Sequence, residues 1–251
     1  MNSSSVLWRL ATDAAHYLAP SLCAGCTEQI APGATQLCEG CRSSMETAPY
    51  PEEIYSSILG SDAYADGVEI DAVGSLYHFA PDSPIREVVH AIKYRGCRGL
   101  AEEIGVDTGR TLSVFPEFRS VDVVVPIPLH PARYRERGYN QAEMIARGVA
   151  RGIGVPVFPN ALRRNRHTGT QTALDNDARR RNVEGAFRGI TDEIRGRVIL
   201  LCDDVLTTGA TLRSAARALL QAGATSVVGG TIAFDDISGP TVGPIAAIPI
   251  P

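Results

Sequence analysis

Residues 198–211 constrain the fold of this chain more than any other stretch. They begin with an unbroken apolar run, Val198 to Cys202, as expected of a strand buried on both faces of a parallel sheet. Two carboxylates follow, Asp203 and Asp204, and then a short loop of hydroxylated residues and glycine. Beyond the loop, apolar residues recur on one helical face: Leu212, Ala215, Ala216, Leu219 and Leu220. The stretch predicts a strand, an acidic pair, a tight loop and a helix within an α/β fold.

The loop has the features of a phosphate-binding site. A loop that opens a helix presents unpaired backbone N–H groups and the positive end of the helix dipole. Gly209 permits close approach of the backbone, and the threonines offer hydroxyl donors. The candidate phosphate cradle consists of Thr207, Thr208, Gly209, Ala210 and Thr211.

The acidic pair narrows the ligand class. Carboxylates beside a phosphate loop repel a polyphosphate unless they face hydroxyls or a metal. A sugar phosphate fits, with its ribose hydroxyls on Asp203 and Asp204. The chain has neither a G-x-x-x-x-G-K-[ST] loop nor a helix-opening G-x-G-x-x-G. The alternative is an N-capped strand–helix turn whose acids are solvated.

The length and charge of the chain limit the class of protein it can belong to. A chain of 251 residues predicts one large domain, or one medium domain with a small one. A net charge of −4 argues against a uniformly basic nucleic-acid binder, although it allows a local basic patch. No apolar run is long enough to span a membrane, and the N-terminal segment makes a poor signal peptide. We therefore expect a cytoplasmic protein.

Four of the six cysteines form two C-x-x-C pairs, Cys23 with Cys26 and Cys38 with Cys41. In a reducing compartment, such pairs indicate a metal site rather than disulfides. Each pair can wrap a turn around one ion, and together they complete a tetrahedral thiolate shell. Four thiolates favour Zn²⁺ over iron, and a shell without an open position makes the metal structural. The alternative is four free thiols.

Two further segments are rich in arginine. The first follows the apolar strand at residues 121–125 and leads to Arg137 and Gly138, where a parallel sheet places ligand contacts. Its alternative is a solvated basic loop. The second, residues 163–185, is a long polar stretch that includes Arg166; loops of this length within a compact domain are usually functional or mobile.

The chain divides into four parts on these signals. We expect an N-terminal helix and zinc-ribbon module at 1–47, a linker with a short helix at 48–71, the main α/β domain at 72–236 and a loose tail at 237–251. Within the main domain we expect strands at 72–79, 121–125, 197–202 and 226–234. We expect helices from 84 to an end within 93–96, at 100–114, after 141 and after 209.

These landmarks, in this order, resemble the ComF family, also called GntX-like: a cysteine ribbon followed by a type I phosphoribosyltransferase-like domain. The matching segments are the four cysteines and residues 92–96, 125–128, 137–142, 163–171, 181–187 and 198–211. The resemblance implies the type I phosphoribosyltransferase fold, a central and mostly parallel sheet flanked by helices.

The resemblance also assigns roles around phosphoribosyl pyrophosphate (PRPP), bound with Mg²⁺. Asp203 and Asp204 would hold the ribose 2′ and 3′ hydroxyls, and the cradle would bind the 5′-phosphate. Arg137 and Gly138 would contact the pyrophosphate. The segment from 163 to 181 would be a flexible lid, with Arg166 stabilising the leaving group. The expected reaction transfers the phosphoribosyl group from PRPP to a nitrogenous base; no segment identifies that base.

A second interpretation is a non-catalytic protein of competence and DNA uptake. The ribbon and the basic loops would then bind single-stranded DNA or a DNA-processing partner such as a helicase. Near the basic loops the sequence offers only Tyr134 and Tyr139 as aromatics, so a stacking platform is not evident. A third interpretation makes the ribbon a dimerisation module, giving a homodimer.

Overall fold

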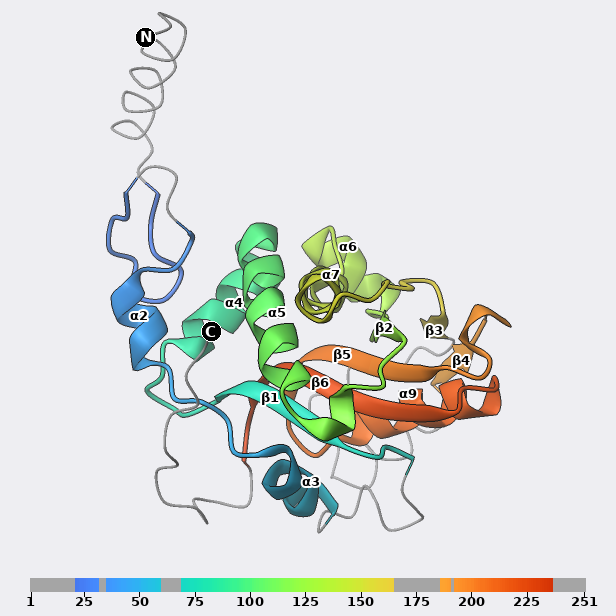
Figure 1. The fold of residues 1–251 in the computed structure, drawn as a ribbon. Coiled ribbons are helices and arrows are strands. Elements are labelled where there is room, and N and C mark those ends of the chain that lie inside the picture. Colours follow the sequence, from blue (N-terminus) through green and yellow to red (C-terminus); the bar gives the residue numbers. More distant parts are fainter. Residues whose placement is uncertain (1–20, 32–34, 60–68, 165–185, 191, 237–251) are drawn as a thin grey trace, which may run out of the picture.

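The computed structural model describes residues 21–31, 35–59, 69–164, 186–190 and 192–236 (Figure 1). The expected N-terminal helix, most of the lid segment and the tail lie outside these ranges. The described helices are α2 (Glu39–Ser44), α3 (Pro51–Leu59), α4 (Ile85–Tyr94), α5 (Arg98–Ser113), α6 (Pro131–Arg137), α7 (Gln141–Ile153) and α9 (Ala210–Gln221), with 3₁₀ turns η2 (Pro116–Phe118) and η3 (Asp192–Ile194). The described strands are β1 (Val73–His78), β2 (Val123–Pro126), β3 (Leu162–Arg164), β4 (Phe187–Gly189), β5 (Val198–Leu206) and β6 (Ser226–Phe234).

Four strands form a parallel sheet in the order β1-β6-β5-β2. Helices α5 and α7 pack on one face, and α3 and α9 pack on the other (Figure 1). The short strands β3 and β4 form a separate antiparallel pair beside α9. This arrangement confirms the expected central parallel sheet flanked by helices. Because the strands are parallel, their carboxyl ends meet at one edge, where ligands bind in open α/β sheets.

Strand β5 runs to Leu206, four residues beyond the end expected from the sequence. It pairs with β6 along this extension, with Asp203 opposite Thr231 and Val205 opposite Ala233. Acidic residues are poor strand formers, but pairing with the long neighbouring strand overrides that local preference. Successive side chains of a strand point to opposite faces, so the two adjacent aspartates face different sides of the sheet.

Helices α5 and α7 approach each other through glycines. A Cβ added at Gly148 would lie 2.0 Å from the carbonyl oxygen of Glu102, and one at Gly105 would lie 2.3 Å from that of Ile145. A Cβ at Gly109 would lie 2.4 Å from Val149 O, and one at Gly152 would lie 2.5 Å from Val106 O. The backbones of the two helices are therefore in direct contact, and α5 fixes the place of α7.

The described part of the predicted linker packs on the sheet. Ile54 and Ile58, one turn apart on α3, are buried against its core. The chain before α3 hydrogen-bonds to the edge strand β1, with Ala48 N donating to Leu76 O at 3.0 Å. This contact covers an edge that would otherwise expose unpaired backbone groups.

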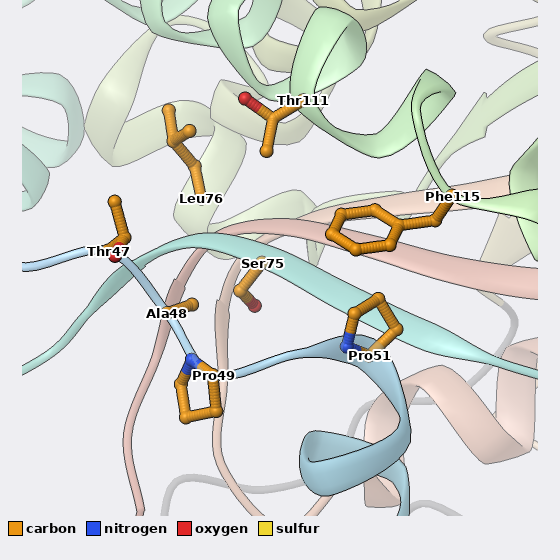
Figure 2. A pocket seen from close by; sticks show the side chains of 8 residues that line it. All are labelled: Thr47, Ala48, Pro49, Pro51, Ser75, Leu76, Thr111 and Phe115. Atoms are coloured by element: carbon orange, nitrogen blue, oxygen red, sulfur yellow. The ribbon is translucent and has the colours of Figure 1, made fainter. Parts of the chain in front are cut away.

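A small pocket remains where this segment meets β1 and the end of α5. Figure 2 shows the side chains that line it: Thr47, Ala48, Pro49, Pro51, Ser75, Leu76, Thr111 and Phe115. Its volume of about 10 Å³ is at the lower limit for one water molecule. It is therefore too small for an organic ligand.

None of the helices in the described ranges is long and apolar enough to cross a membrane.

Candidate functional site

The start of α9 lies directly beyond the carboxyl end of β5. Gly209 precedes the helix with φ 74°, a left-handed conformation that favours glycine, and has no side chain to cap the helix. The Thr208 hydroxyl accepts a long hydrogen bond from the Ala210 N–H at 3.5 Å. Among the described residues, the amides of Thr207 and Gly209 have no hydrogen-bond partner. Ala210 and Thr211 occupy the first turn of the helix. The structure therefore brings the predicted cradle residues together as an open, N–H-rich turn.

Asp204 faces inward. Its side chain is only 9% exposed. Its Oδ2 accepts from Gln141 Nε2 at 3.0 Å and lies 3.2 Å from Lys93 Nζ. Its Oδ1 accepts from the backbone N–H of Val205 at 2.7 Å. Both oxygens of this carboxylate are therefore engaged, and α4 supplies its countercharge.

Asp203 has a different environment. Its Oδ1 accepts from the backbone N–H of Asp204 at 2.9 Å, its one hydrogen bond within the described ranges. Burial, and then the neighbouring Asp204 charge, raise the pKa of Asp203 to about 7, against the opposing effects of the Asp204 backbone N–H and then of Lys93 and Arg164. Asp203 is thus an acid with spare acceptor capacity that titrates near neutral pH.

The predicted basic loop after β2 contains a short helix, α6. Pro131 opens it, and Gly138 ends it with φ 74°. The guanidinium of Arg137 stacks over the ring of Tyr94, with Cζ 5.0 Å from the ring centroid. Its Nε is buried and has no hydrogen-bond partner among the described residues. Arg137 therefore retains an N–H donor for an incoming anion.

Residues 139–141 tie this helix to the acidic pair. The Tyr139 hydroxyl donates to Ile92 O at the end of α4. Asn140 caps α7 through Ala142 N at 3.2 Å and donates to Ile127 O at 3.0 Å. Gln141, the first residue of α7, reaches Asp204. The end of α4, the start of α7 and the end of β5 are thereby joined in one network.

No sequence signal predicts a site role for Lys93, Tyr94 or Gln141, which the structure places in this network. Their motifs matched the resembled family, but nothing local predicts that the end of α4 contacts β5. Of the predicted lid, Arg163 and Arg164 belong to β3, and Arg164 acts electrostatically on Asp203. Arg166 lies outside the described residues.

The four paired cysteines form a second candidate site. Their Sγ atoms all lie within 4.8 Å of one another, and Cys26 Sγ is 3.8 Å from Cys38 Sγ. A tetrahedral zinc site with Zn–S bonds of about 2.3 Å has sulfur–sulfur edges of about 3.8 Å. The donor set and its spacing therefore fit one structural Zn²⁺.

Backbone amides support the cysteine cluster. Cys23 Sγ accepts from the N–H groups of Gly25 at 3.4 Å and Cys38 at 3.3 Å. Burial opposes ionisation of Cys23, but these hydrogen bonds outweigh it and lower its pKa to about 6. Burial and the neighbouring cysteines raise the pKa of Cys41. A bound cation would hold all four groups as thiolates.

The segment that carries the cysteine cluster packs beside α4 and α5. Arg42 of α2 forms ion pairs with Glu103 and, at 2.6 Å, with Asp107 of α5. Arg95, directly after α4, donates to the carbonyl oxygen of Ala24 inside the first cysteine turn at 2.6 Å. The end of α4 therefore contacts both the ribbon and the acidic pair.

Comparisons with known proteins agree with this geometry. Residues 139–240 match the family model described as the phosphoribosyl transferase domain. The chain is 27% identical over 201 residues to competence protein F of Haemophilus influenzae, covering 74% of this chain and 85% of that protein. It is 33% identical over 141 residues to competence protein ComFC of Bacillus subtilis, covering 55% of each.

The DNA utilization protein YhgH of Escherichia coli O157:H7 is 36% identical over 106 residues, or 42% of this chain and 46% of that protein. The chain thus spans about half the length of YhgH and of ComFC. The family match and these relatives confirm the resemblance drawn from the motifs, and the match to the phosphoribosyl transferase domain confirms the expected fold.

Proposed function

We propose that this chain, which resembles the ComF family of phosphoribosyltransferase-like proteins, binds PRPP and transfers its phosphoribosyl group to a nitrogenous base. The observation that carries this proposal is the juxtaposition at the carboxyl edge of the sheet. There the start of α9, whose N-cap Gly209 has no capping side chain, follows shortly after the end of β5, the strand that carries Asp203, an acid with spare acceptor capacity. A small ligand that carries both an anion and a diol could bind the start of α9 with its anion and Asp203 with its diol.

The 5′-phosphate would lie against the cradle residues 207–211. Their backbone N–H groups and the dipole of α9 favour a phosphate dianion, and the threonine hydroxyls add donors. The positive φ of Gly209 turns the chain into the helix without a side chain in the way of the ligand.

The ribose diol would lie on Asp203, with Asp204 behind it. A carboxylate accepts hydrogen bonds from two adjacent hydroxyls, and Asp203 has the free acceptor positions. Both oxygens of Asp204 already accept hydrogen bonds or lie beside Lys93. Asp204 would therefore contact the diol through a remaining lone pair, or would act on it indirectly through Asp203.

Pyrophosphate would lie towards Arg137 and Gly138, with Arg166 of the lid closing over it. Mg²⁺ bound with PRPP supplies further neutralisation of the pyrophosphate charge, and carboxylate, hydroxyl and phosphate oxygens are its usual ligands. The Arg137 guanidinium offers a buried N–H that gains a partner when the anion arrives.

The transfer breaks the bond between C1′ and the pyrophosphate oxygen, and the electron pair leaves with pyrophosphate. A ring nitrogen of the base forms the new bond to C1′ and releases its proton to solvent. Positive charge develops on the sugar and negative charge on the leaving group, so arginines fixed at the pyrophosphate stabilise the transition state. Exclusion of water prevents hydrolysis of the donor.

A two-part experiment tests this proposal. Calorimetry with PRPP and Mg²⁺ should show saturable binding that Asp203→Asn weakens strongly, while Asp192→Asn, a change at an acid with a 93% exposed side chain, leaves it unaltered. A panel of nucleobases should then identify one that releases pyrophosphate. Absence of PRPP binding in the folded wild-type protein contradicts the proposal, whereas binding without release under every base supports a PRPP-binding protein that is not a transferase.

A second candidate function is single-stranded DNA binding. The helix α6 exposes Tyr134, 52% accessible, between the exposed Arg133 and Arg135, and the relatives are named for competence and DNA utilization. Stacking and backbone contacts of this kind suit single strands. Retention of an oligonucleotide should fall with rising salt and fall further in Arg135→Glu. Salt-independent or absent retention excludes this role.

A further inference from the structure

Of the 24 basic residues in this chain, only Lys93 is a lysine. It is the penultimate residue of α4, and its Nζ lies 3.2 Å from Asp204 Oδ2. A lysine ammonium is a compact point charge, whereas an arginine guanidinium is a planar fork that needs more room. The single lysine of this chain thus contacts Asp204, the acid of the candidate site that faces inward.

Three groups hold Asp204 in place. Lys93 from α4 and Gln141 from α7 share its Oδ2, and the backbone of β5 occupies its Oδ1. No comparable contact restrains the second oxygen of Asp203 within the described ranges. Asp203 and Asp204 are therefore adjacent in sequence but unequal in structure. Asp204 is held in place and its charge is compensated, whereas Asp203 has acceptor positions available for a ligand.

We propose that Lys93 is a positioning residue of the sugar-phosphate site: it holds Asp204 as a charge-compensated inner acid, so that Asp203 serves as the outer acid that receives the sugar hydroxyls. The proposal rests on the proposed function, because it names how that site is kept ready for its ligand. Lys93 remains on Asp204 when the ligand is bound, and it does not contact the ligand itself.

The electrostatics of the pair are consistent with this role. The charged or titratable groups that act on Asp203 are Asp204 and Cys202 from its own strand, Lys93 from α4 and Arg164 from β3. The Asp204 backbone N–H and the two cations favour the ionised form of Asp203, whereas burial and the Asp204 charge oppose it. Removal of Lys93 leaves Asp204 uncompensated, which makes ionisation of Asp203 harder.

The first test uses the single lysine as a spectroscopic reporter. Reductive ¹³C-methylation labels only Lys93 and the α-amino group of the chain, and the methylated lysine keeps its charge. The Lys93 methyl signal should move in Asp204→Asn and move much less in Asp203→Asn. On addition of PRPP with Mg²⁺ it should keep a position distinct from that of a solvent-exposed lysine. A shift to that exposed position shows that Lys93 leaves Asp204, and this overturns the proposal.

The second test measures PRPP affinity across pH in Lys93→Met and Lys93→Arg. In the wild type, affinity should rise with pH through about 7 as Asp203 ionises. In Lys93→Met this rise should move up by about one pH unit, which lowers affinity at pH 7 roughly tenfold. Lys93→Arg should restore most of the affinity because it keeps the charge. Arg151→Met, which removes an exposed cation paired with Glu102, is the matched control.

The outcomes separate this proposal from the proposed function. If the wild type binds PRPP and Lys93→Met keeps both its affinity and its pH profile, the positioning role is wrong and the proposed function stands. If the wild type does not bind PRPP, the proposed function is wrong, and so is the role that rests on it. Thermal unfolding of Lys93→Met checks that an altered profile does not come from misfolding; Lys93→Arg provides the charge-retaining variant should Lys93→Met fail to fold.

Discussion

Replacement of Gly148 by alanine tests how α7 is held. The new Cβ would lie 2.0 Å from Glu102 O, 2.8 Å from Gly105 Cα and 2.8 Å from Val106 N. All three are backbone atoms of α5, so none can rotate away. A carbon–oxygen contact needs about 3.3 Å, so the helices must part by about 1.3 Å at this point.

Two opposing effects set the change in the free energy of unfolding of Gly148→Ala. Alanine in a helix interior is favoured over glycine by about 1 kcal/mol. Overpacking of a close contact costs typically about 1–3 kcal/mol, and more where backbone must move. We expect Gly148→Ala to lower the free energy of unfolding by about 1–2 kcal/mol and the melting temperature by about 2–8 °C. Because α7 begins at Gln141, the same displacement should weaken PRPP binding.

Gly99→Ala is the matched control on α5. No atom lies within 4 Å of a Cβ at Gly99, which is exposed. Only the helix preference acts there, so this variant should be more stable than the wild type by up to about 1 kcal/mol. Urea denaturation of both variants gives the comparison. Stabilisation by Gly148→Ala, or changes of the same sign in both variants, refutes the account of the α5–α7 contact.

Two further predictions concern charge and metal. Burial would raise the pKa of Glu69, but Arg213 and Arg217 of α9 hold it below its ordinary value of 4.5. These two ion pairs of Glu69 therefore stabilise the fold above about pH 4.5, and their contribution is lost as pH falls through the lowered pKa of Glu69. Glu69→Gln should flatten that part of the acid denaturation curve. An unchanged curve contradicts the ion pairing. Cys38→Ser should reduce bound zinc well below the expected one ion per chain, measured by atomic absorption, and equal metal content in variant and wild type would rule out the four-thiolate site.

Local patterns predicted the elements that depend on nearby residues. The strand at 226–234 matches β6 as expected, and α4 begins one residue after Pro84 and ends at Tyr94, within the segment 93–96 predicted for its end. The two C-x-x-C pairs predicted a cluster that the structure brings together. In each case the determinant is a spacing of a few residues, which a sequence displays directly.

Non-local contacts account for the differences between the predictions from the sequence and the structure. The extension of β5 through Asp203 comes from pairing with β6, which no local propensity records. The helix α6 is polar on all sides, so its periodicity gives no signal, although Pro131 and Gly138 mark its ends. The contact of Lys93 with Asp204 joins segments far apart in the chain, and only the folded sheet makes the two acids unequal.

The most direct test of the account is the response of backbone amides to PRPP. In ¹H–¹⁵N spectra, titration with PRPP and Mg²⁺ should shift the resonances of Thr207, Gly209 and Ala210 at the start of α9, together with the Arg137 side chain. The amides around the small pocket at Thr47 and Phe115 should stay in place. Shifts confined to other regions, or none at saturating PRPP, contradict a sugar-phosphate site at this helix.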